Sequence, residues 1–498
     1  MSIAKSAIIV IFVVLIGKIL GFLRDITVAY IFGISAVMDA YSVAVNISNI
    51  AILIVAVYFT QIFIPTYTSI REKQSEEKAL TMANNAFGIF LIVSIVLMFI
   101  FMLLAPLILR MTGFDEQSHN LALTAVRIIL LSMPLVAFIQ FSIGYLMARK
   151  SFLGQKFMDI PANIVFIALG FVVVRYGGIV ELSSAWVMIF VVQFFVMIIW
   201  MYKERYRPRF SFHLNTPDIR SDIRLLIPAV LSTSAIVINV WIDTVIASHL
   251  GVGYAASIGF ATRLVLFAQS LIIIPIAGII FSHMSEYAAK NNITQMLNTL
   301  WHTARVTLFI IVPILIIAIP SGFDIVRIAY ERGEFTPEAT VLTGTALIWS
   351  LPKLLGLTVL YFTTNFYLAL KDIKKPLIAN VIALVVNIFF SIWLSSFMGI
   401  AGIALATVIG KTLAAVILLV FLYKEFGHLS GNFLQKMVSI LKILLYAIPC
   451  AVAVMITRYT FIDSLDLLRF FVVTVIGGAV YLFVAFILKE PVMLEFFQ

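Results

Sequence analysis

Long apolar stretches separated by short polar gaps recur along the whole chain. A helix needs about 20 predominantly apolar residues to cross the hydrocarbon core of a bilayer, and by that measure the pattern predicts about fourteen membrane-spanning helices. The predicted spans are residues 5–31, 40–68, 82–109, 121–147, 158–175, 184–202, 223–248, 255–285, 297–319, 340–363, 376–396, 401–423, 438–458 and 467–488. The expected fold class is therefore an all-α polytopic membrane protein.

The amino-acid composition also indicates that most of this chain is embedded in lipid. Of its 498 residues, 62% are hydrophobic and 12% are charged, whereas soluble chains are about half apolar and a quarter charged. The single cysteine, Cys450, excludes an intramolecular disulfide and a thiolate metal cluster. The net charge of +10 resides mostly in the short gaps, which is a topology signal and not a nucleic-acid-binding patch.

Lysine and arginine concentrate in every second gap, and the intervening gaps are richer in acidic residues. Because basic gaps face the cytoplasm and the number of spans is even, we expect both termini to be cytoplasmic. The longest gap on the opposite side is about residues 320–339. A membrane glycosyltransferase, polymerase or ligase usually needs a larger catalytic loop, so we predict that the chain is not an enzyme.

The two halves resemble each other at an offset of roughly 220 residues. Asp25 and Gly33 recur as Asp243 and Gly251 at the same spacing, and further matches follow in order. Two parallel six-helix repeats are a plan of alternating-access carriers, with the substrate site between the lobes. The predicted parts are an N-terminal lobe at 1–203, a basic cytoplasmic linker at 204–222, a C-terminal lobe at 223–424, and two extra helices at 425–498.

Several ionisable residues lie inside the predicted spans, where a charge costs at least about 2.5–3.5 kcal/mol and normally faces a cavity or a partner. They are Lys18, Arg24, Asp25, Asp39, Asp243, Arg263, Arg305, Lys353 and Lys411. Cations outnumber anions, which predicts a positive cavity. Snorkelling is the alternative for Arg24 and Arg263, and above all for Arg305.

Two local patterns leave alternatives open. Gly17 and Gly21 flank Lys18 in a G-x-x-x-G pattern, which permits close helix approach or local unwinding, although ordinary packing explains it as well. The matched positions Asp25 and Asp243 suggest symmetrical pairing between the lobes or helix capping, with ion coupling as a further option.

Gly410-Lys411-Thr412 superficially resembles a phosphate-binding loop. Leu405 stands where that loop requires glycine and the surroundings are apolar, so nucleotide binding is excluded. We expect no cofactor, and transport driven by a coupling ion such as Na⁺ or H⁺, by the membrane potential, or by the substrate's own gradient.

A cationic cavity in an apolar carrier favours an anionic, amphipathic substrate, because arginine and lysine bind phosphate through charge-assisted hydrogen bonds. A polyprenyl diphosphate glycolipid supplies both an anion and a long tail. Our hypothesis is that the two helices outside the repeat form a groove for that tail.

Several motifs together resemble the MurJ (MviN) lipid II flippases of the MATE-like exporter superfamily. They span about residues 10–425 in order: Gly17-Lys18-Ile19-Leu20-Gly21-Phe22-Leu23-Arg24-Asp25, Ile31-Phe32-Gly33, Asp39-Ala40-Tyr41, Asn49, Phe63-Ile64-Pro65, Ala261-Thr262-Arg263-Leu264 and Glu331-Arg332-Gly333-Glu334-Phe335-Thr336. The resemblance implies a fourteen-helix, two-lobed carrier that moves the lipid-linked peptidoglycan precursor outward.

The resemblance also implies roles for individual residues. Arg24 and Arg263 would engage the diphosphate, Asp39 would be a cavity carboxylate, and Lys18 stands where the family usually has arginine. Candidate cavity or gating residues are Asp25, Asn49, Asp243, Lys353 and Lys411. The chain departs from the family at Ile52, Leu53 and Leu266, where charged residues are common.

The leading interpretation is a flippase of the bacterial inner membrane for undecaprenyl-diphosphate-linked saccharide, with lipid II the favoured substrate. Another polyprenyl-linked glycan, such as an O-antigen, capsule or exopolysaccharide unit, is the close alternative. A cation-coupled small-molecule exporter is the second hypothesis, and a membrane glycosyltransferase or ligase the third. Expected partners are the lipid-linked glycan, membrane lipids and cell-envelope synthesis enzymes, without nucleic acid.

Overall fold

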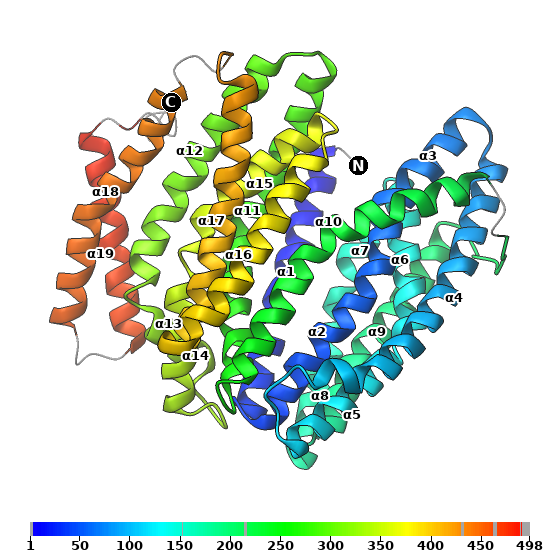
Figure 1. The fold of residues 1–498 in the computed structure, drawn as a ribbon, viewed down its shortest axis with the longest axis horizontal. Coiled ribbons are helices and arrows are strands. Elements are labelled where there is room, and N and C mark those ends of the chain that lie inside the picture. The colour runs from blue at the N-terminus through cyan, green and yellow to red at the C-terminus, as the bar shows by residue number, and fades with distance from the viewer. Residues whose placement is uncertain are drawn as a thin grey trace. The chain divides into compact units, whose positions relative to one another are not determined.

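The computed structural model describes residues 3–151, 153–213, 217–429, 433–461, 466–488 and 490. All regular secondary structure among these residues is helical (Figure 1), which confirms the predicted all-α class. The chain forms two compact units. Unit 1 is Met1–Ala256 with Arg332–Phe335, and unit 2 is Ser257–Glu331 with Thr336–Gln498.

Unit 1 contains the first half of the helices and the π-helical segment η1. In chain order these are α1 (Ile3–Phe32), α2 (Ala36–Val57), η1 (Tyr58–Phe63), α3 (Ile64–Lys73), α4 (Glu76–Leu109), α5 (Glu116–Leu130), α6 (Met133–Ala148), α7 (Leu153–Phe157), α8 (Asp159–Tyr176), α9 (Ile179–Lys203) and α10 (Pro217–Ser248).

The next helix, α11 (Tyr254–Ala289), begins at the end of unit 1 and continues in unit 2. The remaining helices belong to unit 2: α12 (Ile293–Ala318), α13 (Gly322–Tyr330), α14 (Pro337–Ser350), α15 (Lys353–Ala369), α16 (Lys374–Met398), α17 (Ile400–Phe426), α18 (Phe433–Thr460) and α19 (Asp466–Ile487).

Each of the fourteen predicted spans overlaps a helix or a pair of helices. Among the described residues, eight helices are long and apolar enough to cross a membrane, and ten spans result if each of two bent pairs counts as one. The chain is thus a multi-pass membrane protein, and the number fourteen stays a prediction.

The two bent pairs support the predicted repeat. Helices α5 and α6 meet at 46°, and α14 and α15 meet at 43°. Pro134 lies at the start of α6 and Pro352 directly precedes α15, and these prolines occupy matching places in the two halves. Proline lacks an N–H and clashes with the preceding turn, so it breaks each span at the same point.

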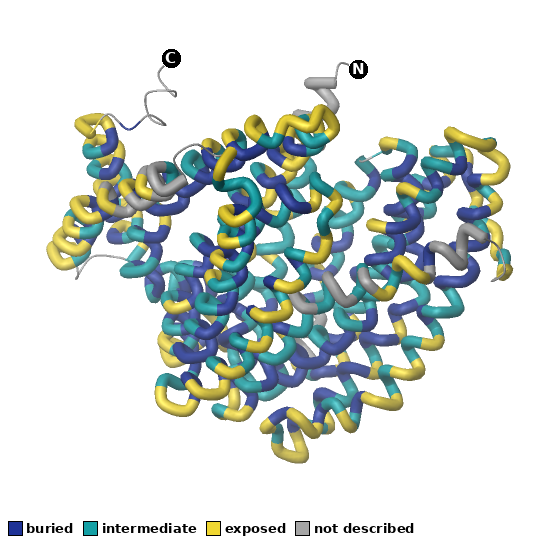
Figure 2. The backbone as a smooth tube through the Cα atoms, turned by 45° about the horizontal axis from the view of Figure 1, so that its top comes forward, coloured by how far each residue is buried: buried dark blue, intermediate teal, exposed yellow. Residues whose placement is uncertain are grey.

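Large apolar side chains are exposed along many helices. Leu103 on α4 is 81% exposed and Phe171 on α8 is 80% exposed. In Figure 2, buried and exposed residues alternate along the helices, so single helices combine a packed side with an open one. So many exposed large apolar side chains favour lipid over water as the surroundings of these helices.

Polar contacts hold α10 against α2, η1 and α3 inside unit 1. Asn46 donates to the hydroxyl of Thr244 at 2.9 Å. Nearer the other end of α10, the buried carboxylate of Asp222 accepts from Tyr58 at 3.0 Å and from Thr66 at 2.8 Å. These contacts explain why α10, which opens the second half of the sequence repeat, belongs to the first compact unit.

The last two helices pack on α12 inside unit 2. Residues from α12, α18 and α19 share one buried apolar cluster that includes Phe309, Cys450 and Tyr481. At one end, Arg305 of α12 forms an ion pair with Glu490 at 2.7 Å. Arg305 is therefore paired within the protein, and the snorkelling interpretation of this residue stays a prediction.

At the other end of this helix pair, a network of charged side chains joins α13 to α18 and α19. The carboxylate of Asp324, 1% exposed, accepts from Arg458 at 2.8 Å and from Arg469 at 2.5 Å. Asp466 pairs with Arg469 and also with Arg327. The α18–α19 pair is thus fixed to unit 2 at both ends as well as through its apolar face.

Candidate functional site

Helix α1 carries three of the candidate residues, Lys18, Arg24 and Asp25, and it is helical without interruption through Gly17 and Gly21. A methyl group added at Gly17 would lie 3.7 Å from the Cβ of Asp159 on α8. The glycines therefore serve helix packing at ordinary contact distance, and local unwinding is not observed.

Aromatic rings and a carboxylate surround Arg24. Its guanidinium lies 5.2 Å from the ring centre of Trp186 on α9 and 5.9 Å from that of Phe166 on α8. Its Nη2 lies 3.1 Å from Oδ1 of Asp25, and the two side chains are only 21% and 13% exposed. A cation held over aromatic faces keeps its charge in an apolar environment, so Arg24 is fixed in place and is not snorkelling into solvent.

Asp159, the first residue of α8, extends this arrangement. It interacts electrostatically with Lys18 and with Arg24, and it accepts a hydrogen bond from the side-chain amide of Gln193 on α9 at 3.1 Å. Helices α1, α8 and α9 together therefore build a cluster of charged and aromatic side chains, which we name the Arg24 cluster: Lys18, Arg24, Asp25, Asp159, Phe166, Trp186 and Gln193.

The charges of the Arg24 cluster are balanced. The cluster holds two cations, Lys18 and Arg24, and two carboxylates, Asp25 and Asp159, so the candidate residues of unit 1 do not carry the cationic excess that the sequence predicts. The excess among the candidate residues comes from unit 2, with Arg263, Lys353 and Lys411.

The structure gives Asp39 a different role from the one that the resemblance implies. It is 2% exposed, and its two carboxylate oxygens accept from the backbone N–H groups of Gly253 at 2.5 Å and Ala256 at 2.7 Å. Free N–H groups at a helix start need such acceptors. Asp39 therefore caps the first turn of α11, and the expectation that it lines a cavity is corrected.

Replacing Asp39 with alanine should lower the free energy of unfolding by about 2 kcal/mol, at the upper end of capping losses, because two buried N–H groups lose their acceptor. Asp39→Asn should cost less, since one oxygen remains. Reversible unfolding in a detergent titration measures both changes. If transport falls while stability is unchanged in Asp39→Ala, the carboxylate acts on the substrate and not as a cap.

The other candidates of unit 1 lie inside helices. Asp25 is in the last third of α1, and Asp243, 7% exposed, is in the second half of α10. Neither is at the start of its own helix, and both symmetrical pairing and helix capping stay predictions for this matched pair. Asn49 is half-buried on α2, one turn from Asn46, which bonds to α10.

The candidates of unit 2 lie on three helices. The guanidinium of Arg263 on α11 lies 5.1 Å from the ring centre of Phe260. Lys353, 8% exposed, is the first residue of α15 at the break in its span. Lys411 is half-buried on α17 beside Thr412, and a methyl at Gly356 of α15 would lie 2.9 Å from the Thr412 hydroxyl. Close packing of α15 on α17 thus positions the two lysines.

Sequence reasoning missed four members of the Arg24 cluster: Asp159, Phe166, Trp186 and Gln193. An acidic residue at the start of an apolar span could have marked Asp159. No sequence pattern distinguishes Trp186 or Phe166 from the other aromatic residues of these helices, because their role depends on facing α1.

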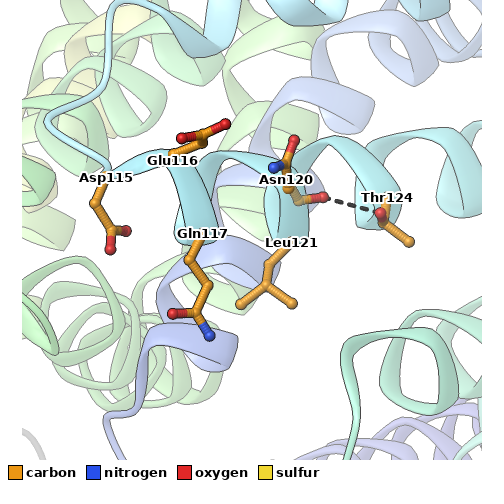
Figure 3. Close-up of a pocket in the computed structure, with 6 residues that line it drawn as sticks. All are labelled: Asp115, Glu116, Gln117, Asn120, Leu121 and Thr124. Atoms are coloured by element: carbon orange, nitrogen blue, oxygen red, sulfur yellow. Dashed lines mark hydrogen bonds between the residues drawn. The ribbon is translucent and has the colours of Figure 1, made fainter.

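A separate surface hollow lies beside the first turns of α5 (Figure 3). Its lining is Asp115, Glu116, Gln117, Asn120, Leu121 and Thr124. Hydrogen bonds from Ser118 lower the pKa of Asp115, so this carboxylate is charged at neutral pH. An acidic lining repels a phosphate, and the hollow is not a diphosphate site.

Comparison with known proteins decides the family. The sequence profile of the family described as "Lipid II flippase MurJ" matches residues 28–476. The chain belongs to the lipid II flippase MurJ family. A relative from Rhizobium tropici named "Probable lipid II flippase MurJ" is 27% identical over 446 residues, which cover 86% of this chain and 82% of that protein.

Solved structures agree on the fold of this MurJ-family chain. A structure titled "Lipid II flippase MurJ, inward closed conformation" matches with a TM-score of 0.83 at 21% identity, covering 98% of this chain and 100% of that one. A multidrug resistance MATE family transporter in an inward-facing conformation matches with a TM-score of 0.72 at 16% identity, covering 82% and 96%. The chain therefore shares its fold with this MATE transporter.

Proposed function

We propose that this chain moves lipid II from the inner to the outer leaflet of the bacterial cytoplasmic membrane by alternating access. Membership of the MurJ family supports the substrate. The observation that carries the proposal is the Arg24 cluster, because it places an arginine and a lysine near carboxylates and aromatic rings on otherwise apolar helices. A diphosphate is a ligand that such cations bind.

Within this proposal, Arg24 and Lys18 bind the diphosphate in different ways. The planar guanidinium of Arg24 can donate two parallel hydrogen bonds to phosphate oxygens, whereas the ammonium of Lys18 acts as a point charge. Asp25 and Asp159 neutralise these cations while the site is empty. An incoming diphosphate must displace these two carboxylates as the partner of Lys18 and Arg24. The carboxylates can pair with the cations again when the diphosphate leaves, so binding and release are both possible.

Arg263 of unit 2 is the second proposed diphosphate ligand, by its motif position in the family. Its ring contact with Phe260 resembles the aromatic support of Arg24. Lys353 and Lys411 are proposed cavity or gating residues on the same unit.

The α18–α19 pair is the proposed groove for the polyprenyl tail. Its packing on α12 and its charged contacts at both ends support a fixed position. Both termini are proposed to be cytoplasmic, and the driving force is proposed to be a Na⁺ or H⁺ gradient or the membrane potential. Binding of cell-envelope synthesis enzymes stays a prediction.

Complementation tests the proposal. The chain, with its membrane level verified, is expressed in a bacterium depleted of its essential lipid II flippase. We expect growth to be restored by the wild-type chain and not by Arg24→Ala. Lysis despite normal membrane levels would contradict lipid II as substrate and would favour another polyprenyl-linked glycan.

A further inference from the structure

The linker between α9 and α10 is held against α4 along its described part, residues 204–213. Helix α9 ends in a turn in which Arg205 adopts a positive φ of 55° and the N–H of Tyr206 donates to Met201 at 3.1 Å. A left-handed residue with this hydrogen bond is a common way for a helix to end. The ring of Tyr206 then stacks on Tyr145 of α6, with ring centres 4.3 Å apart.

Two adjacent asparagines of α4 fix the linker backbone. The side-chain oxygen of Asn84 accepts from the Tyr206 hydroxyl at 2.7 Å and from the N–H of Arg209 at 2.8 Å. Asn85 accepts from the N–H of His213 at 2.6 Å and donates to its carbonyl at 2.7 Å. The linker is therefore docked as an extended segment and is not a loose tether.

The linker contacts α4 at the point where the polar first part of this helix changes to its apolar part. From Ala86 to Leu109 the helix carries no charged residue, whereas Glu76, Glu77 and Lys78 lie in its first turn. Directly beyond the asparagines, a Cβ at Gly88 would lie 2.8 Å from the carbonyl carbon of Ser211, so glycine allows the linker to lie close. The linker thus follows the expected boundary between headgroups and hydrocarbon.

The side chains that the linker exposes suit that boundary. Phe210 is 61% exposed and Phe212 is 44% exposed, and Arg205, Arg207 and Arg209 are all exposed. Among the described residues, none of the three guanidinium groups has an acidic partner. Aromatic rings favour the membrane interface, and arginines beside a span attract anionic lipids.

We propose that this segment, residues 205–212, is a binding surface for the headgroups of anionic phospholipids in the leaflet that the positive-inside rule assigns to the cytoplasm. Phe210 and Phe212 enter the interface, and the three arginines bind phosphates. Because the backbone is fixed by Asn84 and Asn85 before any lipid binds, little conformational entropy is lost on binding.

Fluorescence quenching by brominated lipids tests this surface directly. The only cysteine, Cys450, is replaced by alanine, and Phe210→Cys is labelled with an environment-sensitive fluorophore in the full chain. The protein is reconstituted in phosphatidylcholine vesicles that contain equal small fractions of either brominated phosphatidylglycerol or brominated phosphatidylcholine. We expect phosphatidylglycerol to be enriched near the label by about fivefold or more relative to phosphatidylcholine. Attraction by a single basic residue near an anionic surface is enough for an enrichment of this size.

A charge variant and a matched control complete the design. Arg205→Gln, Arg207→Gln and Arg209→Gln together should reduce the excess to the phosphatidylcholine level. Lys371→Gln, Lys374→Gln and Lys424→Gln together remove the same charge from exposed positions of unit 2 and should leave the excess unchanged.

Three results would overturn the proposal. Equal quenching by the two lipids would exclude headgroup recognition, and quenching by neither would exclude an interfacial position. Loss of the excess in the lysine control would show attraction by overall charge alone. The readout needs no transport, so its failure is distinct from a failure of the proposed lipid II activity.

Discussion

Arg24→Ala is expected to abolish lipid II transport, with a loss of at least about 100-fold. A hydrogen bond to a charged group contributes about 1.5–3 kcal/mol, and the guanidinium can donate two of them to a diphosphate. The aromatic support from Trp186 and Phe166 has no function once the cation is gone. Transport of fluorescent or radiolabelled lipid II into vesicles that contain the purified chain measures the effect.

Two further variants make the Arg24 result interpretable. Arg24→Lys keeps the charge and loses the two-pronged geometry, so it should retain part of the activity. Arg110→Ala removes an exposed arginine at the end of α4 and should be indistinguishable from the wild type. Full activity in Arg24→Ala would disprove the assignment of this residue to the diphosphate.

Asp324→Asn is expected to produce the largest loss of stability. Removing one partner of a buried ion pair costs about 3–5 kcal/mol, because the remaining charge is left uncompensated. Here two arginines, Arg458 and Arg469, depend on the same buried carboxylate. Unfolding of the purified protein in a reversible detergent titration measures the change, which should be accompanied by loosening of α18 and α19.

Glu331→Gln is the matched control for this network. Glu331 pairs with Arg327 at 3.2 Å, and these side chains are 21% and 41% exposed. Exposed pairs contribute at most about 1 kcal/mol, so the control should change stability little. Equal losses in the two variants would mean that the Asp324 network does not fix the last helix pair.

The candidate site shows where sequence reasoning succeeds and where it stops. An ionisable residue inside an apolar span is conspicuous in one dimension, so Lys18, Arg24 and Asp25 could be selected without a structure. Their partners could not be selected, because Trp186 is an ordinary aromatic residue until α9 is placed beside α1. Asp39 illustrates the reverse error: its motif match at the edge of a predicted span suggested a cavity, whereas its oxygens cap a helix that begins more than 200 positions later.

The sequence by itself determined the all-helical membrane class, the approximate positions of the helices and the family. The hydrophobicity of a stretch of about 20 residues and the charge of a short gap are local properties of the sequence. Bilayer thickness and the cost of burying charge then decide which stretches cross the membrane and which gaps face the cytoplasm. Only the tertiary structure decided the partners of the buried charges, the breaks in two spans, and the docking of the linker on Asn84 and Asn85. These features depend on side chains far apart in the chain, and a local pattern carries no information about which of them meet.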